Sequence, residues 1–395
     1  MTGVLRSDTG HEAAPLDDPG ETPTPRDIAA LIVELQSAGL RTDAEVETRT
    51  GGAGPSDSGM LWIEGMPVTV PVRTEEARRS PYVLRPEDDG GRAIYRDGRR
   101  LASVAASRRP RYYDRETADG IPYWKIALLH LDSMASTVVQ TCNYWNTADQ
   151  CRFCGIGVSL AAGSTIVKKT PEQLAEVSVA AKELDGAVDA TLTTGSSTAP
   201  DRGARYVARC GRAVKDASGL PVEIQFEPPR DLAILDEVYD TGGSDAVGIH
   251  VESFDPQVLA HVAPGKARTG IETYFRTWER AVELWGSGRV STYVILGMGE
   301  DPDLTVEACR RAVDIGVYPF IVPLRPVAGS LMEDWAPPPG PYSNRIYWQV
   351  AAYMSQRGMS ADDAVAGCAR CQACSAINAV QQPLLKIGPR PGSAS

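Results

Sequence analysis

From about Ile126 to residue 335, short apolar runs typical of buried strands alternate with longer amphipathic runs typical of helices. The six predicted strands are Thr137–Gln140, Ala187–Thr193, Val222–Phe226, Ala246–Val251, Val290–Leu296 and Tyr318–Val322. The helices predicted between them are Pro171–Leu184, Arg202–Ala217, Leu232–Tyr239, Ile271–Trp285 and Asp303–Asp314. Strands joined by helical crossovers pair in parallel, and such a sheet must curl or be covered on both faces. We therefore predict an α/β fold whose main part is a partial, TIM-like (β/α)6 barrel.

Smaller parts are predicted on both sides of this barrel. Residues 1–25 lack periodicity and form a loose arm, and Asp27–Ala38 has the apolar stripe of an amphipathic helix. A Gly/Ser-rich linker at Thr50–Ser58 precedes two strand-forming regions, Leu61–Val72 and Tyr82–Leu101. We divide the chain into an N-terminal arm and small α+β cap (1–125), the barrel (126–335) and a C-terminal extension (336–395).

The composition excludes several classes of partner. A formal charge of −11 argues against an obligatory nucleic-acid partner. No apolar stretch approaches the ~20 residues that span a bilayer, and the N-terminus lacks the pattern of a secretory signal. Six of the eight cysteines fall in two tight groups, which favours metal ligation in a reducing compartment over disulfides. We expect a cytoplasmic protein without a membrane partner.

The first cysteine group follows the first predicted barrel strand, in the run TCNYWNTADQCRFCG from Thr141 to Gly155. Its cysteines are Cys142, Cys151 and Cys154. Three thiolates are one short of completing a four-iron cluster, which leaves one iron free to bind a small molecule. In barrels of this kind the chemistry lies at the carboxyl ends of the strands, where this loop is predicted to lie. A zinc knuckle or a structural thiol cluster is the alternative.

Polar residues also follow three later strands. Gly195 and Ser196 come directly after the second strand, where glycine permits close backbone approach and the hydroxyl can hydrogen-bond. Glu227 follows the third strand and Glu252 the fourth. Because the carboxyl ends of parallel strands meet at one mouth, we expect these groups to face the cysteine loop.

The second cysteine group, Cys368, Cys371 and Cys374, has the spacing C-x2-C-x2-C that opens a ferredoxin-type cluster run. The position of the fourth cysteine is occupied by Asn378. Zinc normally takes two separated pairs, so we predict a second, auxiliary iron–sulfur cluster, with zinc as the alternative. Its remaining iron could take Ser375, another residue or the substrate.

The first loop resembles those of radical S-adenosylmethionine (SAM) enzymes, although their usual spacing is C-x3-C-x2-C and here it is C-x8-C-x2-C. The resemblance implies a [4Fe-4S] cluster whose open iron chelates the amino and carboxylate groups of SAM. It also implies that the glycine motif at Gly195 and Ser196 holds the methionyl amine, although the customary acidic residue is absent.

Two further runs, Val251–Arg268 and Ile295–Glu300, resemble parts of lipoyl synthase and biotin synthase. By that comparison Glu252 and Arg268 contact SAM, and Gly297–Glu300 forms the turn beside the adenine. The long first loop together with the C-terminal triad also resembles radical SAM proteins of nitrilase-linked and thiosugar-nucleoside gene clusters.

These resemblances imply an enzyme that reductively cleaves SAM to a 5′-deoxyadenosyl radical and abstracts hydrogen from a small-molecule substrate. Sulfur insertion from the auxiliary cluster follows, with a flavodoxin- or ferredoxin-type reductant as partner. His250, Tyr293 and Arg325 are candidate substrate contacts. One alternative is a radical rearrangement, dehydrogenation or epimerisation in which the second cluster relays electrons. The other is a non-catalytic zinc or iron–sulfur scaffold.

Overall fold

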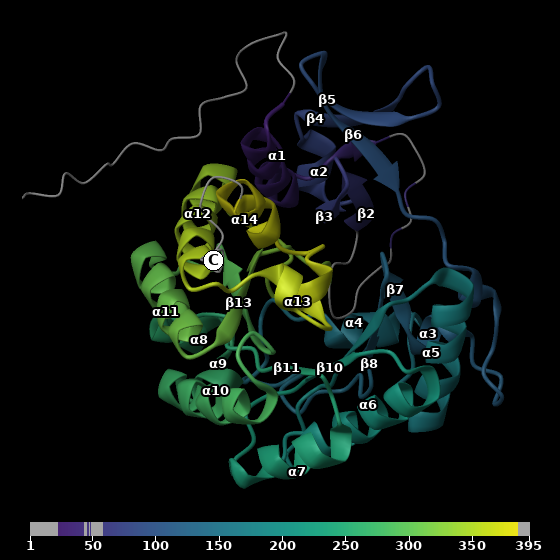
Figure 1. Ribbon diagram of the computed structural model, residues 1–395, viewed down its shortest axis with the longest axis vertical. Helices are drawn as coiled ribbons and strands as arrows, with labels where there is room; N and C mark the ends of the chain where they lie inside the picture. The colour runs from purple at the N-terminus through teal and green to yellow at the C-terminus, as the bar shows by residue number, and fades with distance from the viewer. Residues whose placement is uncertain (1–22, 43–45, 47, 49–57, 386–395) are drawn as a thin grey trace, which may run out of the picture.

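A computed structural model describes residues 23–42, 46, 48 and 58–385 (Figure 1). The predicted α/β fold is confirmed, because the six expected strands pair in parallel in one sheet of order β13-β12-β11-β10-β9-β8-β7. The parallel strands are β8 (Ser133–Thr137), β9 (Asp189–Thr193), β10 (Val222–Gln225), β11 (Ala246–Gly248), β12 (Val290–Leu296) and β13 (Val317–Pro323). An additional strand, β7 (Leu128–His130), pairs antiparallel with β8 at the edge of the sheet.

Helices on the outer side of the sheet connect its strands (Figure 1). They are α5 (Pro171–Asp185), α6 (Ala204–Ser218), α7 (Ala233–Gly242), α10 (Ile271–Trp285) and α11 (Pro302–Asp314). The start of α5 follows local rules, because the side chain of Thr170 accepts the amide hydrogen of Gln173 and Pro171 occupies the first turn. Shorter helices, α4 (Ile156–Ala161), α8 (Pro256–Val262) and α9 (Pro264–Ala267), lie in the loops after β8 and β11.

The two faces of the sheet differ in chemistry. Side chains alternate along a strand, so in β9 Ala190 and Leu192 enter the hydrophobic core while Thr191 and Thr193 line a cavity. The inner face of this barrel is therefore polar and partly open. A ligand site can form there without disturbing the packing between sheet and helices.

One strand prediction was displaced. The predicted strand Thr137–Gln140 begins earlier, because the ladder of β8 runs over Ser133–Thr137 and starts from a hairpin with β7. Ser133 and Ser136 are buried polar residues of this strand, so the apolar pattern places the start of the strand too late. The backbone beyond the ladder remains extended, and the amide of Val138 still donates to Thr193 O at 2.8 Å.

The N-terminal part forms a separate six-stranded sheet of order β1-β4-β5-β6-β2-β3, which agrees with the expected α+β cap. Its elements are α1 (Pro25–Ala38), β1 (Arg41–Thr42), β2 (Ser58–Ile63), β3 (Met66–Pro71), α2 (Glu75–Arg79), β4 (Tyr82–Pro86), β5 (Arg92–Arg96) and β6 (Arg99–Ala106). Most of the predicted arm 1–25 and of the linker Thr50–Ser58 lies outside the described residues. The domain boundaries at residues 125 and 335 stay predictions. Short segments η1 (Arg111–Asp114) and α3 (Tyr123–Ile126) lead from the cap to the barrel.

The C-terminal extension contains α12 (Gly340–Gln356), η2 (Ala361–Asp363), α13 (Cys368–Cys371) and α14 (Ile377–Leu385). Helix α12 packs against α1, α11 and α14, and α13 lies between the cap and the barrel strands (Figure 1). None of the helices in the described part of the chain combines the length and apolar character that a bilayer span needs.

Candidate active site between two cysteine triads

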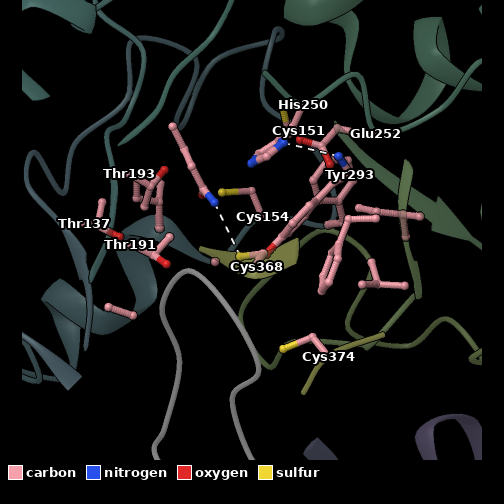
Figure 2. A pocket seen from close by; sticks show the side chains of 18 of the residues that line it. Thr137, Cys151, Cys154, Thr191, Thr193, His250, Glu252, Tyr293, Cys368 and Cys374 are labelled. Atoms are coloured by element: carbon pink, nitrogen blue, oxygen red, sulfur yellow. Dashed lines mark hydrogen bonds between the residues drawn. The ribbon is translucent and has the colours of Figure 1, made fainter. Parts of the chain in front are cut away.

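A cavity of about 380 Å³ lies on the inner face of the barrel, and it extends to the loops at the carboxyl ends of the strands. Both predicted cysteine groups line it, although more than 200 residues separate them in the chain. We call them the first triad and the second triad; Figure 2 shows members of both around one cavity. The cysteines are Cys142, Cys151 and Cys154 in the first triad and Cys368, Cys371 and Cys374 in the second.

The eight residues between Cys142 and Cys151 form compact turns, so the long spacing does not separate the thiols. The amide of Trp145 donates to Cys142 O at 3.1 Å, and the side chain of Gln150 accepts the amide hydrogen of Asn146 at 2.9 Å. A further turn joins the amide of Cys154 to Cys151 O at 3.1 Å. The three thiols of the first triad consequently face the same cavity.

The loop also carries a residue that the sequence did not indicate, Tyr144. Its hydroxyl donates to Glu227 Oε1 at 3.0 Å and accepts from Arg202 Nη1 at 2.9 Å. Burial and the adjacent carboxylate raise the pKa of Tyr144 to about 12, so it remains a phenol donor at neutral pH. Glu227 is buried and accepts a second hydrogen bond, from Ser196 Oγ at 2.6 Å.

Gly195 is required by close packing against the cysteine loop. A Cβ atom at this position would lie 2.1 Å from Thr141 O, which no side chain can tolerate. The structure therefore brings Gly195, Ser196 and Glu227 together beside the first triad, and all three line the cavity. Their predicted contacts with SAM stay predictions that this placement supports.

Glu252 also lines the cavity, where it forms a buried ion pair with Lys266. The two side chains are 9% and 15% exposed, and Lys266 Nζ donates to His250 O at 3.0 Å as well. Burial alone would lower the pKa of Lys266, but the carboxylate of Glu252 raises it well above its usual value. Glu252 has a φ of 72°, in the left-handed region that non-glycine residues seldom adopt. The strained backbone directs its carboxylate at the lysine.

Lys266 was not predicted, and it lies in the cavity wall where Arg268 was expected to contact SAM. Arg268 is 60% exposed and pairs through both terminal nitrogens with Asp149 at the surface. Two positions on a helix differ in direction by about 200°, so one cation of the run faces the cavity and the other faces away from it. A contact of Arg268 with SAM stays a prediction that this placement does not support.

The second triad lies on α13 and the turn after it, and the N-terminal cap encloses it. The amide of Thr69 in β3 donates to Ala373 O at 2.6 Å, and its hydroxyl lies 3.8 Å from Cys374 Sγ. Cys371 Sγ lies 3.9 Å from His130 O. The cap, to which the sequence assigned no chemistry, thus forms one wall of this triad.

Helix α13 is anchored to the barrel by buried charges. Arg370 pairs with both Asp132 and Asp189, and the amide of Gly367 donates to Asp189 Oδ2 at 2.6 Å. A Cβ at Gly367 would lie 2.1 Å from the carboxylate of Glu223, so only glycine fits before Cys368. These contacts fix the orientation of the triad over β9 and β10.

The donor set of each triad fits an iron–sulfur cluster, which uses cysteine thiolates as ligands. All six thiols are unpaired, and burial raises the pKa of Cys154 to about 11 and that of Cys371 to about 12. Such thiols stay protonated unless a metal centre stabilises the thiolate. Across residues 23–42, 46, 48 and 58–385, no three His, Cys, Asp or Glu side chains form a site for a single metal ion.

Ser375, considered above as a fourth ligand, and the two remaining cysteines can also be placed. Ser375 is buried and accepts the amide hydrogen of Ile377 at 3.2 Å, at the start of α14, and it does not line the cavity. Cys210 and Cys309 are fully buried in the helical core, as expected for small apolar side chains. Within the described residues, neither Ser375 nor these two cysteines line the cavity beside the second triad.

His250, Tyr293 and Arg325 all line the cavity, as predicted for substrate contacts. The ring of His250 stacks on Tyr293 at 4.2 Å, and its Nδ1 accepts the amide hydrogen of Tyr293 at 3.2 Å (Figure 2). Burial, and then the charge of Lys266, lowers the pKa of His250 to about 3, so the ring is neutral and Nε2 carries its proton. Neither His250 Nε2 nor Arg325 Nη1 has a hydrogen-bond partner among the described residues.

Comparison with known proteins identifies the class. Residues 140–313 match the family model of the radical SAM superfamily. This segment contains the first triad, Gly195, Ser196, Glu227 and Glu252, so the barrel part of the chain matches the radical SAM superfamily, a family whose members use SAM and a [4Fe-4S] cluster.

A curated relative, bacteriochlorophyllide c C-7(1)-hydroxylase of Chlorobaculum limnaeum, is 27% identical over 220 residues. The alignment covers 50% of this chain and 54% of the relative, so the chain spans about half the length of that protein. Among solved structures, methylornithine synthase shares 17% identity over 57% of this chain and 62% of its own, with a TM-score of 0.44. A radical SAM methyltransferase from Sphaerobacter thermophilus shares 16% identity over 77% and 84%, with a TM-score of 0.43.

Proposed function

We propose that this radical SAM enzyme holds a small-molecule substrate between two iron–sulfur clusters and inserts sulfur from the second cluster at a substrate carbon. The observation that carries the proposal is the single cavity lined by both triads. A substrate bound in that cavity would be adjacent to both the site of radical formation and the second triad. The three thiolates of the second triad leave the fourth position of a four-iron cluster to another ligand, and this supports direct contact between cluster and substrate.

The protein residues divide into holding and orienting groups. Cys142, Cys151 and Cys154 hold the first cluster, and Cys368, Cys371 and Cys374 hold the second. When bound, the first supplies an electron that cleaves SAM to methionine and a 5′-deoxyadenosyl radical, and the second supplies a sulfide that bonds to the substrate carbon radical while one iron is reduced by one electron.

SAM binding is assigned to the polar groups beside the first triad. Glu227, oriented by Tyr144 and Ser196, offers a carboxylate for the methionyl ammonium. Lys266 offers a buried positive charge near Cys151, where it offsets the negative charge of cluster and carboxylate. The ion pair with Glu252 holds the ammonium group of Lys266 in place.

The cavity also indicates the class of substrate. His250 Nε2 and Arg325 Nη1 are buried donors without partners, and leaving such donors unpaired costs about 1–3 kcal/mol each. Arg325 forms no ion pair within the described part of the chain. Thr137, Thr191 and Thr193 lie together in another part of the cavity wall, across from His250 (Figure 2). A substrate with several oxygen acceptors, one of them anionic, would satisfy these groups.

The proposal is tested by anaerobic reconstitution with 34S-labelled sulfide. We expect about eight irons per chain, 5′-deoxyadenosine formation from SAM and dithionite, and 34S in the product from a panel of hydroxylated anionic compounds. Cys371→Ala should keep SAM cleavage and lose sulfur transfer, whereas Cys151→Ala should lose both. A product without 34S, formed over many turnovers with the second cluster intact, would instead indicate an electron relay. Zinc in the triads without SAM cleavage would indicate a scaffold.

The curated relative is named a hydroxylase, which suggests oxygen transfer as a second outcome of the same radical. The same anaerobic assay run in 18O-labelled water separates the two, because a product hydroxylated by water would carry 18O and no 34S. We favour sulfur insertion because the second triad faces the cavity and contributes three thiols to its wall.

A further inference from the structure

Cys368 differs from the other triad cysteines in the groups around its sulfur. Tyr293 Oη lies 2.8 Å from Cys368 Sγ, and Gln225 Nε2 donates to the same sulfur at 3.4 Å. In the second triad, Cys374 has only the hydroxyl of Thr69 at 3.8 Å, and Cys371 lies 3.9 Å from the carbonyl of His130, an acceptor. Within the part of the chain that the structure describes, two side-chain donors converge only on Cys368.

Both donors are held in place by other contacts. The ring of Tyr293 is stacked between His250, at 4.2 Å, and Phe320, at 5.1 Å, which directs its hydroxyl at Cys368 (Figure 2). A tyrosine hydroxyl can donate a hydrogen bond, so Tyr293 donates one to this sulfur once the sulfur is a thiolate.

The amide of Gln225 is oriented by Glu223, a fully buried residue of the same strand. Gln225 Nε2 donates to Glu223 Oε2 at 2.7 Å, and the same oxygen accepts the amide hydrogen of Cys368 at 3.1 Å. Ser291 Oγ donates to the other carboxylate oxygen at 2.9 Å. The carboxylate thus requires the nitrogen end of the Gln225 amide to point toward it, and the remaining amide hydrogen faces Cys368.

We propose that Tyr293 and Gln225 are positioning residues that set the reduction potential of the second cluster through two hydrogen bonds to the thiolate of Cys368. Hydrogen bonds to a ligating sulfur withdraw electron density and stabilise the reduced, more negative cluster, so they raise its potential. The inference rests on the proposed function. When a carbon radical bonds to a cluster sulfide, the spare electron reduces one iron from the ferric to the ferrous state, and a higher potential favours that step.

The test is an EPR-monitored redox titration of anaerobically reconstituted protein. To isolate the signal of the second cluster, the first triad is removed by Cys142→Ala, Cys151→Ala and Cys154→Ala. In that background, Tyr293→Phe and Gln225→Leu should each shift the midpoint potential of the second cluster to a more negative value, and the double variant should shift it further.

The variants have matched controls. Tyr293→Phe retains the ring stacked on His250, so packing is preserved. Tyr206→Phe removes a comparable hydrogen bond, to Lys169 O at 2.8 Å, from a tyrosine that does not line the cavity, and should leave the midpoint unchanged. With the first triad intact, the midpoint of the first cluster should not move in either variant. If Tyr293→Phe fails to fold, Gln225→Leu alone carries the test.

The outcomes separate this inference from the function on which it rests. Unchanged midpoints in variants that retain their iron would overturn it, and so would loss of the second cluster on Tyr293→Phe, since the tyrosine would then hold the cluster in place. A wild-type protein that takes up only about four irons would refute the proposed function itself. A shifted midpoint in an enzyme that transfers no 34S would support the hydrogen bonds and refute sulfur insertion.

Discussion

The buried ion pair of Lys266 and Glu252 provides the most direct test of the site architecture. Lys266→Met removes the ammonium and leaves the carboxylate of Glu252 buried beside an apolar side chain. Breaking a buried pair by removing one partner typically costs about 3–5 kcal/mol, because the remaining charge is uncompensated. The lost hydrogen bond to His250 O, at 3.0 Å, is part of this cost.

The Lys266→Met/Glu252→Gln double variant should recover most of that loss, since neither charge then remains. We therefore expect a coupling energy of about 2–4 kcal/mol between the two positions. The measurement is urea denaturation of the iron-free protein under reducing conditions, followed by far-UV circular dichroism, so that cluster binding does not contribute.

Two results would contradict this reasoning. One is a loss below about 1 kcal/mol on Lys266→Met, the size of a surface pair. The other is additivity of the two single substitutions. The surface pair of Arg268 and Asp149 is the matched control, because its guanidinium is 60% exposed and Arg268→Met should cost less than about 1 kcal/mol.

Three further predictions concern individual residues of the cavity. His250 is neutral when folded, with a pKa lowered to about 3 from its usual 6.5, so the unfolded state takes up a proton that the folded state refuses as the pH falls below 6.5. This contribution to the free energy of unfolding is complete above pH 6.5 and is about 2 kcal/mol smaller at pH 5. Between pH 7.5 and pH 5, the free energy of unfolding of His250→Gln should therefore fall by about 2 kcal/mol less than that of the wild type, as measured by parallel denaturation series. Gly195→Ala should prevent the cysteine loop from closing, because the added Cβ would lie 2.1 Å from Thr141 O; the expected result is loss of four irons per chain with the second cluster retained, measured by iron and sulfide analysis. Tyr144→Phe removes a 3.0 Å hydrogen bond to the carboxylate of Glu227 and should cost about 1.5–3 kcal/mol, measured by urea denaturation; an unchanged midpoint would show that the bond is not formed.

The fold was largely predictable because its signals are local. Alternating strand and helix patterns gave six parallel strands, and the capping residues Thr170 and Pro171 placed the start of α5 correctly. The displaced first strand shows the limit of that reasoning. Ser133 and Ser136 are buried polar residues of β8, and hydrophobic periodicity cannot identify a strand in which buried positions are polar.

The residues of the site that directly follow strand ends could be predicted from the sequence. The residues that tertiary contacts bring into the site could not. The three polar groups after β9 and β10 meet the cysteine loop because parallel strands share one mouth. The choice of Lys266 over Arg268 depends on the direction of a single helical turn after β11. Tyr293 was predicted only as a substrate contact and Gln225 not at all, because only the placement of α13 brings Cys368 to their side chains.

The segment that is similar to known proteins covers only part of the candidate site, so this similarity does not identify the reaction. The segment that matches the superfamily, residues 140–313, contains the first triad and the buried pair beside it, to which the proposed function assigns formation of the radical. The second triad, Arg325 and the wall formed by Thr69 all lie outside that segment, and in the proposed function they surround the place where the radical is consumed. Arg325 Nη2 donates to Thr69 O at 2.7 Å, so cap and barrel meet at the second triad. Under the proposed function the flanking parts determine the product, so proteins that share only the barrel segment need not share the reaction.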